Sequence, residues 1–135
     1  MAFAYTTFVN NVAGMTISGV TRAYTAPPQQ LSTADLPASY PRLPIADNQS
    51  VTLTHGRGLL AAAVEIVVVM EPYRQGTNVA NFAACVTMID AIETALATNA
   101  NTYDVDRWNI IQTIEEYGVD RPFWQLVARI EGSGT

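Results

Sequence analysis

The chain has 135 residues, twelve acidic side chains, seven arginines and no lysine, which gives a formal net charge of −5. This length is typical of a single domain spanning 1–135, and the missing lysines exclude a P-loop lysine and a Schiff-base lysine. The acidic balance also argues against a surface that binds phosphate backbones. With 49% apolar and only 14% charged residues, the domain has neutral surface that either neighbouring subunits or an efficient core of its own would cover.

The first expected element is a short helix within residues 5–17, where Phe8, Val12 and Met15 recur at helical spacing. A Pro-rich arm or loop follows at about 25–46, because residues 18–46 hold five of the seven prolines and little periodicity. Two interpretations stay open for it. It either wraps its own domain, or it orders on a neighbouring subunit, with four apolar side chains as candidate inter-subunit contacts: Leu31, Leu36, Tyr40 and Leu43.

The run 59–72 is expected to form the central strand, since it is rich in β-branched residues and ends at Pro72. Val64, Ile66 and Val68 share one wholly apolar face and are candidate core residues. The opposite face carries both apolar and acidic side chains. A strand with these two faces belongs in the middle of a sheet.

A helix is expected over 81–97, where the period changes to 3.6. Its predicted apolar stripe consists of Phe82, Cys85, Val86, Ile89, Ile92 and Leu96, and we place Phe82 and Ile89 in the core. Cys85, the single cysteine, is interpreted as a buried structural thiol and not as a nucleophile.

Two strands joined by a hairpin are expected at the end of the chain. Trp124 and Leu126 lie on the apolar face of the second strand and complete the candidate core, and residues 132–135 are expected to form a frayed tail. The predicted fold is therefore α+β: an antiparallel or mixed sheet of about four to five strands, with one long and one short helix packed on one face.

No motif for catalysis, cofactor binding or metal binding is found in the sequence. His55 is the only histidine and has no cysteine or second histidine to share a metal. Glu115 and Glu116 are adjacent, so on a strand they point to opposite faces and cannot act as a paired acid and base. We expect no enzyme activity, no cofactor and no bound metal.

The order of these elements resembles the tail terminator family of long, non-contractile-tailed bacteriophages, the minor tail protein U-like proteins. Four stretches carry the resemblance: the N-terminal helix with the step Ala34-Asp35-Leu36-Pro37, the strand that ends in Glu71-Pro72, the helix 81–97, and a closing hairpin whose last strand is 124–131. The resemblance covers most of the chain, and it lies mainly in the order and length of the elements. The prolines at 41 and 44 depart from the smoother strand of the family.

The resemblance implies a ring, usually hexameric, that caps the head-proximal end of the tail tube and ends its polymerisation. Its partners would be further copies of itself, the tail tube protein and a head-completion or connector protein. Double-stranded DNA would pass through the lumen without specific binding, and no membrane would be involved. The protein would reside in the virion tail or neck, and in the host cytoplasm during assembly. Two alternatives remain: another neck ring, such as a head–tail joining or stopper protein, and a small ligand-binding or enzymatic α+β domain.

Overall fold

A computed structural model describes residues 3–29, 31–44, 53–56, 59–72, 78–117 and 121–134. The elements follow in the order α1 (Tyr5–Ala13), β1 (Arg22–Ala23), a 3-10 turn (Thr33–Asp35), β2 (Ala38–Arg42), β3 (Leu53–Gly56), β4 (Leu59–Pro72), α2 (Asn78–Asn99), β5 (Val105–Tyr117) and β6 (Arg121–Gly134).

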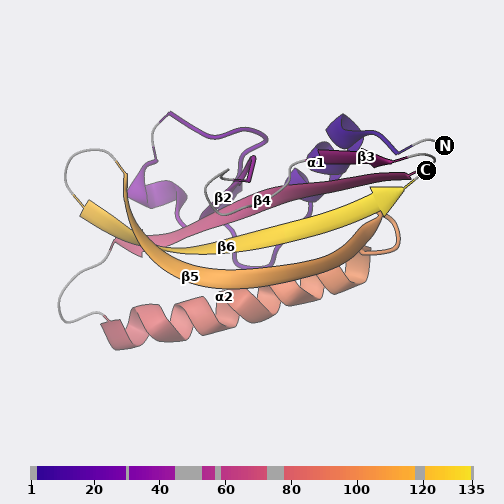
Figure 1. Ribbon diagram of the computed structural model, residues 1–135. Coiled ribbons are helices and arrows are strands. Elements are labelled where there is room, and N and C mark those ends of the chain that lie inside the picture. The colour runs from indigo at the N-terminus through magenta and orange to yellow at the C-terminus, as the bar shows by residue number, and fades with distance from the viewer. Residues whose placement is uncertain are drawn as a thin grey trace.

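The described strands form one six-stranded sheet in the order β1-β2-β4-β6-β5, and β3 lies beside β4. β1 runs parallel to β2, and the other pairs are antiparallel. The prediction of an α+β fold with a mixed sheet, one long helix and one short helix is confirmed (Figure 1). The additional strands are the short ones, β1 and β3, which lie beside longer neighbours.

β4 is the central strand because both of its sides are paired. β6 lies along one side, and β2 and β3 share the other. The side chains of Val64, Ile66 and Val68 are all buried on the face that carries the larger hydrophobic cluster. The alternation of the sequence therefore identified this face correctly.

Both helices contribute to the larger cluster, and α2 runs along the sheet beneath β5 and β6 (Figure 1). α1 supplies Phe8 and Val12, and the hydroxyl of Tyr5 donates a hydrogen bond to the carbonyl of Ala63 at 2.8 Å. From β6, Leu126 is fully buried in this cluster, and Trp124 packs against it with partial exposure.

A second, smaller cluster lies on the opposite face of the sheet. It joins Val67 and Val69 of β4 to Phe123 and Val127 of β6 and to the arm residues Leu36 and Tyr40. The segment before β2 folds onto this face, since Tyr24 and Leu31 pack against the smaller cluster. The amide of Tyr24 also donates to the carbonyl of Ser39 at 2.7 Å, at the edge of the sheet. The mixed face of β4 is thus covered by the chain's own Pro-rich segment.

The buried face of α2 differs from the predicted stripe. Asn81, Cys85, Met88, Ile92 and Leu96 are buried, whereas Phe82 is 63% exposed and Val86 is 45% exposed. Ile89 is partly buried and packs against the larger cluster. The assignment of Phe82 to the core was wrong, because α2 carries apolar residues on two stripes and only one of them faces the sheet.

The predicted frayed tail was also wrong for the residues that the structure describes. Gly132, Ser133 and Gly134 pair with Ala62, Ala61 and Leu60 of β4, so the last strand extends to residue 134. Thr135 lies outside the described residues. A run of Gly, Ser and Gly reads as a tail from composition alone, but in this fold its small residues leave room for aromatic side chains.

Candidate functional site

The acidic, histidine and cysteine side chains do not gather into a site in the part of the chain that the structure describes. That part contains no group of three or more His, Cys, Asp or Glu side chains that could hold a metal ion. Asp104 is exposed, and Asp106 accepts a hydrogen bond from the hydroxyl of Ser133 at 2.5 Å. The side chains of His55, Glu115 and Glu116 lie outside the described residues.

Cys85 is 3% exposed and points into the larger cluster. Burial removes water from the thiol and raises its pKa above the ordinary value of 9.0. A thiol with a raised pKa carries little thiolate at neutral pH, so it is a poor nucleophile and a poor metal ligand. The burial of Cys85 agrees with its interpretation as a structural residue.

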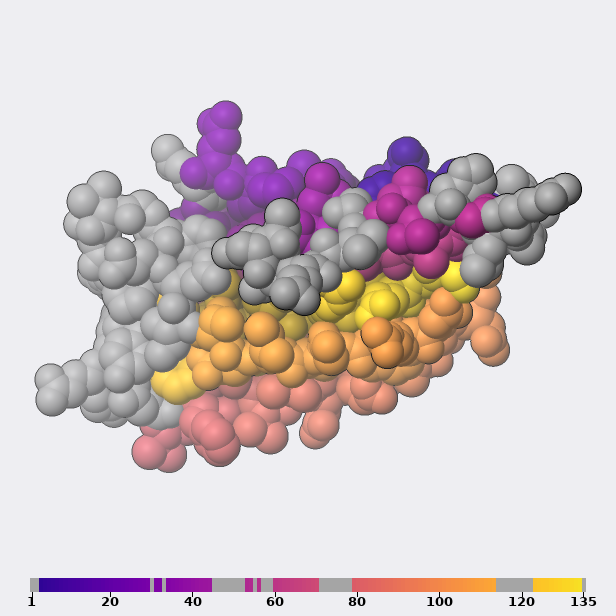
Figure 2. All heavy atoms as spheres, in the orientation of Figure 1, coloured from indigo at the N-terminus to yellow at the C-terminus, as the bar shows by residue number. Residues whose placement is uncertain are grey.

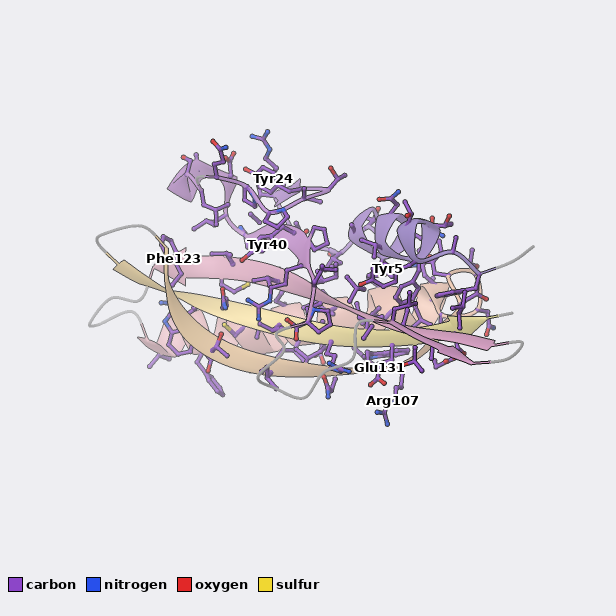
Figure 3. The ribbon with its side chains drawn as sticks, turned by 45° about the horizontal axis from the view of Figure 1, so that its top comes forward. Tyr5, Tyr24, Tyr40, Arg107, Phe123 and Glu131 are labelled. Carbon is purple, nitrogen blue, oxygen red and sulfur yellow. The ribbon has the colours of Figure 1, made fainter. Side chains whose placement is uncertain are left out.

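Ionic side chains on the face opposite α2 pair with one another. Arg42 Nε lies 2.7 Å from Glu65 Oε1, and Glu65 is 5% exposed. Arg107 contacts both carboxylate oxygens of Glu131 at 2.8 and 3.3 Å, and this pairing raises the pKa of Arg107 (Figure 3). Arg129 Nε lies 3.7 Å from the same Glu131. The Arg42–Glu65 and Arg107–Glu131 pairs join neighbouring strands, whereas the contact of Arg129 with Glu131 lies within β6.

The four candidate inter-subunit residues occupy different environments. Leu36 and Tyr40 are each 7% exposed and belong to the smaller cluster, and Leu31 packs against that cluster with partial exposure. Leu36 and Tyr40 are therefore corrected from inter-subunit contacts to core residues of the subunit itself, because the sheet face already covers them. Of the four, only Leu43, 60% exposed at the end of β2, has a largely free side chain.

The missed feature is an exposed apolar stripe on α2. Val79, Phe82 and Val86 follow one another at helical spacing and continue to the partly buried Ile89, and Val79 is 86% exposed. Glu93 continues the stripe, and its carboxylate accepts a hydrogen bond from the indole of Trp108 on β5. Because residues four, seven and eleven apart share one side of a helix, the stripe faces the β5 side of the molecule.

β5 itself is an open edge of the sheet among the described strands. It pairs with β6 along its length and is the last strand in the sheet order. Ile111 on this strand is 57% exposed. Ile111 lies opposite Val127 of the smaller cluster, so it faces away from α2. We call the open edge of β5, with Ile111 on one of its faces and Val79, Phe82 and Val86 of α2 along the other, the β5–α2 surface; β5 and α2 lie side by side in Figure 2.

A second open edge lies on the other side of β4. β3 pairs only with β4 among the described strands, and its Leu53 is 46% exposed. Leu53 lies opposite Ala62 and Arg42 opposite Glu65, so Leu43 and Leu53 lie along the same side of β4. We call β3 together with Leu43 and Leu53 the β3 surface. In the part of the chain described, all large exposed hydrophobic side chains belong to the β5–α2 surface or to the β3 surface.

By length and composition alone, the segment Val79–Asn99 of α2 is also apolar enough to cross a membrane, with a mean hydropathy of 1.4. A core helix meets the same test. The stripe of Cys85, Ile92 and Leu96 packs against the sheet, so burial inside the protein accounts for this part of the apolar composition of α2.

No protein-family model matches the chain, and no curated protein matches it.

Proposed function

We propose that the protein is a structural virion component that forms a ring, usually of six copies, at the head-proximal end of a phage tail. The ring ends polymerisation of the tail tube and joins the tail to the head connector. One observation carries the proposal: among the described residues, the large exposed hydrophobic side chains lie on the β5–α2 surface and the β3 surface. Exposed apolar side chains gathered along open sheet edges in this way favour contact with another protein.

The observed element order supports this proposal. A short helix, an irregular arm, a long central strand, a long helix and a closing hairpin follow one another as in the resemblance on which the proposal rests. The ionic side chains described above pair with one another, and Cys85 is buried, so these groups are used for stability. Such use of polar groups suits a protein that acts by assembly.

The charge of the chain suits a conduit for DNA. With a net charge of −5 and no lysine, a ring of these subunits would release few counterions on contact with the DNA backbone and would bind it weakly. DNA could then slide through the lumen. The tail tube protein and a head-completion protein would bind the two ends of the ring.

Electron microscopy and light scattering of the purified protein, alone and with tail tubes, test this function. The expected result is rings with a central hole wide enough for a DNA duplex, bound to one end of each tube. Rings that do not bind tail tubes but bind isolated connectors would instead favour a head–tail joining protein. A monomer at every concentration, with tubes present, would contradict the proposal.

A further inference from the structure

Resting on the proposed function, we propose that the two open edges of the sheet meet between successive copies in the ring. The β5–α2 surface of one copy packs against the β3 surface of the next copy. The occupant of each exposed surface is therefore a second copy of this chain, and the sheets of neighbouring subunits join edge to edge.

The first argument concerns the backbone. β5 spans Val105–Tyr117 and β3 spans Leu53–Gly56, and each is paired on one side only among the described strands. An open edge presents N–H and C=O groups that pair readily with another strand. Strand addition between copies satisfies these groups and supplies main-chain hydrogen bonds for affinity.

The second argument concerns side chains on the edge of β5. Trp108 and Ile110 face the larger cluster, and the α2 stripe extends past them on the same side of the molecule. A strand added to β5 places every second side chain on this face. Leu53 of the incoming β3 would then pack over Phe82 and Val86 of α2.

Charge does not oppose this contact. The middle of β5, from Trp108 to Thr113, contains no ionisable side chain, and β3 carries no formal charge when its histidine is neutral. Like charges placed directly opposite each other across a strand pair are destabilising, and the contact avoids them. Natural edges are commonly protected by charged residues or proline, and the segment Trp108–Thr113 has neither.

The positions of the two surfaces determine the type of contact between copies. In the sheet order β5 is at one side, and β3 lies on the other side of β4 (Figures 1 and 2). A contact between two different patches is heterologous, and it produces a closed ring when the rotation between copies closes. All copies in such a ring face the same way, so its two ends differ, as a cap between a tube and a connector requires.

Two matched double variants test the contact. Phe82→Lys/Ile111→Lys alters only the β5–α2 surface, and Leu43→Lys/Leu53→Lys alters only the β3 surface. All four side chains are at least 46% exposed, so each variant should keep the fold. Thr87→Lys/Thr94→Lys, on an exposed side of α2 away from the stripe, is the control. Circular dichroism verifies folding, and light scattering gives the mass of each sample.

Each altered variant alone is expected to be a monomer, and the control is expected to form rings. An equimolar mixture of the two altered variants should form two-chain complexes and nothing larger, because such a pair has one intact contact. Normal rings from Leu43→Lys/Leu53→Lys would overturn the inference, since the β5–α2 surface would then pair with itself or with another protein. A mixture that stays monomeric would overturn it as well. Wild-type protein that never assembles would instead contradict the proposed function.

If either altered variant fails to fold, disulfide crosslinking decides. Thr54→Cys is combined with Asn109→Cys or with Ile111→Cys in a Cys85→Ser background, and the assembled protein is oxidised. A ladder of linked chains from at least one combination supports the contact. Intact rings that yield no linked chains from either combination would overturn it.

Discussion

The ring of Phe8 occupies the space that a side chain at Gly132 would need. A Cβ at position 132 would meet Phe8 Cε1 and would stand 2.5 Å from the carbonyl oxygen of Asp104. The aromatic ring is held in the larger cluster and the carbonyl belongs to the backbone, so neither can move cheaply. The last strand therefore needs glycine at this position for packing.

Gly132→Ala should destabilise the protein by about 1–3 kcal/mol, the usual cost of overpacking a tight interior. Urea denaturation followed by circular dichroism measures the change. Ser133→Ala is the control at the neighbouring position; it removes only the hydrogen bond to Asp106 and should cost roughly 0.5–1.5 kcal/mol. A Gly132→Ala protein as stable as the wild type would mean that β6 ends before residue 132.

Two phenylalanines should respond differently to truncation. Phe8→Ala removes a side chain that is 2% exposed and should cost about 3–5 kcal/mol by leaving a cavity. Phe82→Ala removes one that is 63% exposed and should change the stability of the dilute monomer by less than about 1 kcal/mol. Thermal unfolding of both variants at low concentration provides the comparison. A large loss of stability in Phe82→Ala would mean that the α2 stripe containing Phe82 is buried in the core.

Burial of Cys85 makes stability dependent on alkaline pH. The thiol pKa is raised above 9.0 in the folded chain by desolvation, so between about pH 9 and that raised value the unfolded chain loses the proton first. The unfolding free energy should therefore fall as pH rises through this range. Tyr5, whose pKa is raised from 10.0 by burial, adds a decline in the same direction at higher pH.

Urea titrations at several pH values, repeated with Cys85→Ala, isolate the contribution of the thiol. The variant should show a weaker decline below pH 10. In the wild type, a thiol reagent should label Cys85 slowly under native conditions and rapidly in denaturant. Fast native labelling would show that the thiol is accessible.

The Arg42–Glu65 pair should be costly to break from one side. Glu65 is 5% exposed, so Arg42→Met would leave a buried carboxylate without this cation and should cost about 3–5 kcal/mol. The double variant Arg42→Met/Glu65→Met should recover most of the loss. Arg107→Met is the exposed comparison, because Arg107 is 77% exposed and such pairs contribute about 0–1 kcal/mol. Equal losses for the two arginines in denaturant titrations would contradict this assignment.

Much of the fold could be predicted from local pattern. The run 59–72 has β-branched residues and a closing proline, and it forms β4 with the expected bounds. Val64, Ile66 and Val68 were placed correctly because a two-residue period leaves only two choices of face. The final hairpin was found for the same reason.

The orientation of α2 could not be predicted, because its apolar residues make two stripes. One runs through Cys85, Ile92 and Leu96, and the other through Phe82 and Val86. Only packing against the sheet distinguishes them. Leu36 and Tyr40 were misjudged because what they contact, the second face of β4 and β6, is distant in sequence. The β5–α2 surface was missed because the stripe that forms it was assigned to the core.

β6 has a consequence for how the chain can be made. It is the last element of the described chain, yet it lies in the sheet between β4 and β5. During synthesis, the edge of the apolar strand β4 that pairs with β6 therefore stays unpaired until residues 121–134 have left the ribosome. The sheet closes only by pairing segments far apart in sequence, which is a slow kind of folding step. A chain interrupted before residue 121 would expose β4 and β5 together, and ribosomes that stall there would release a product prone to aggregation.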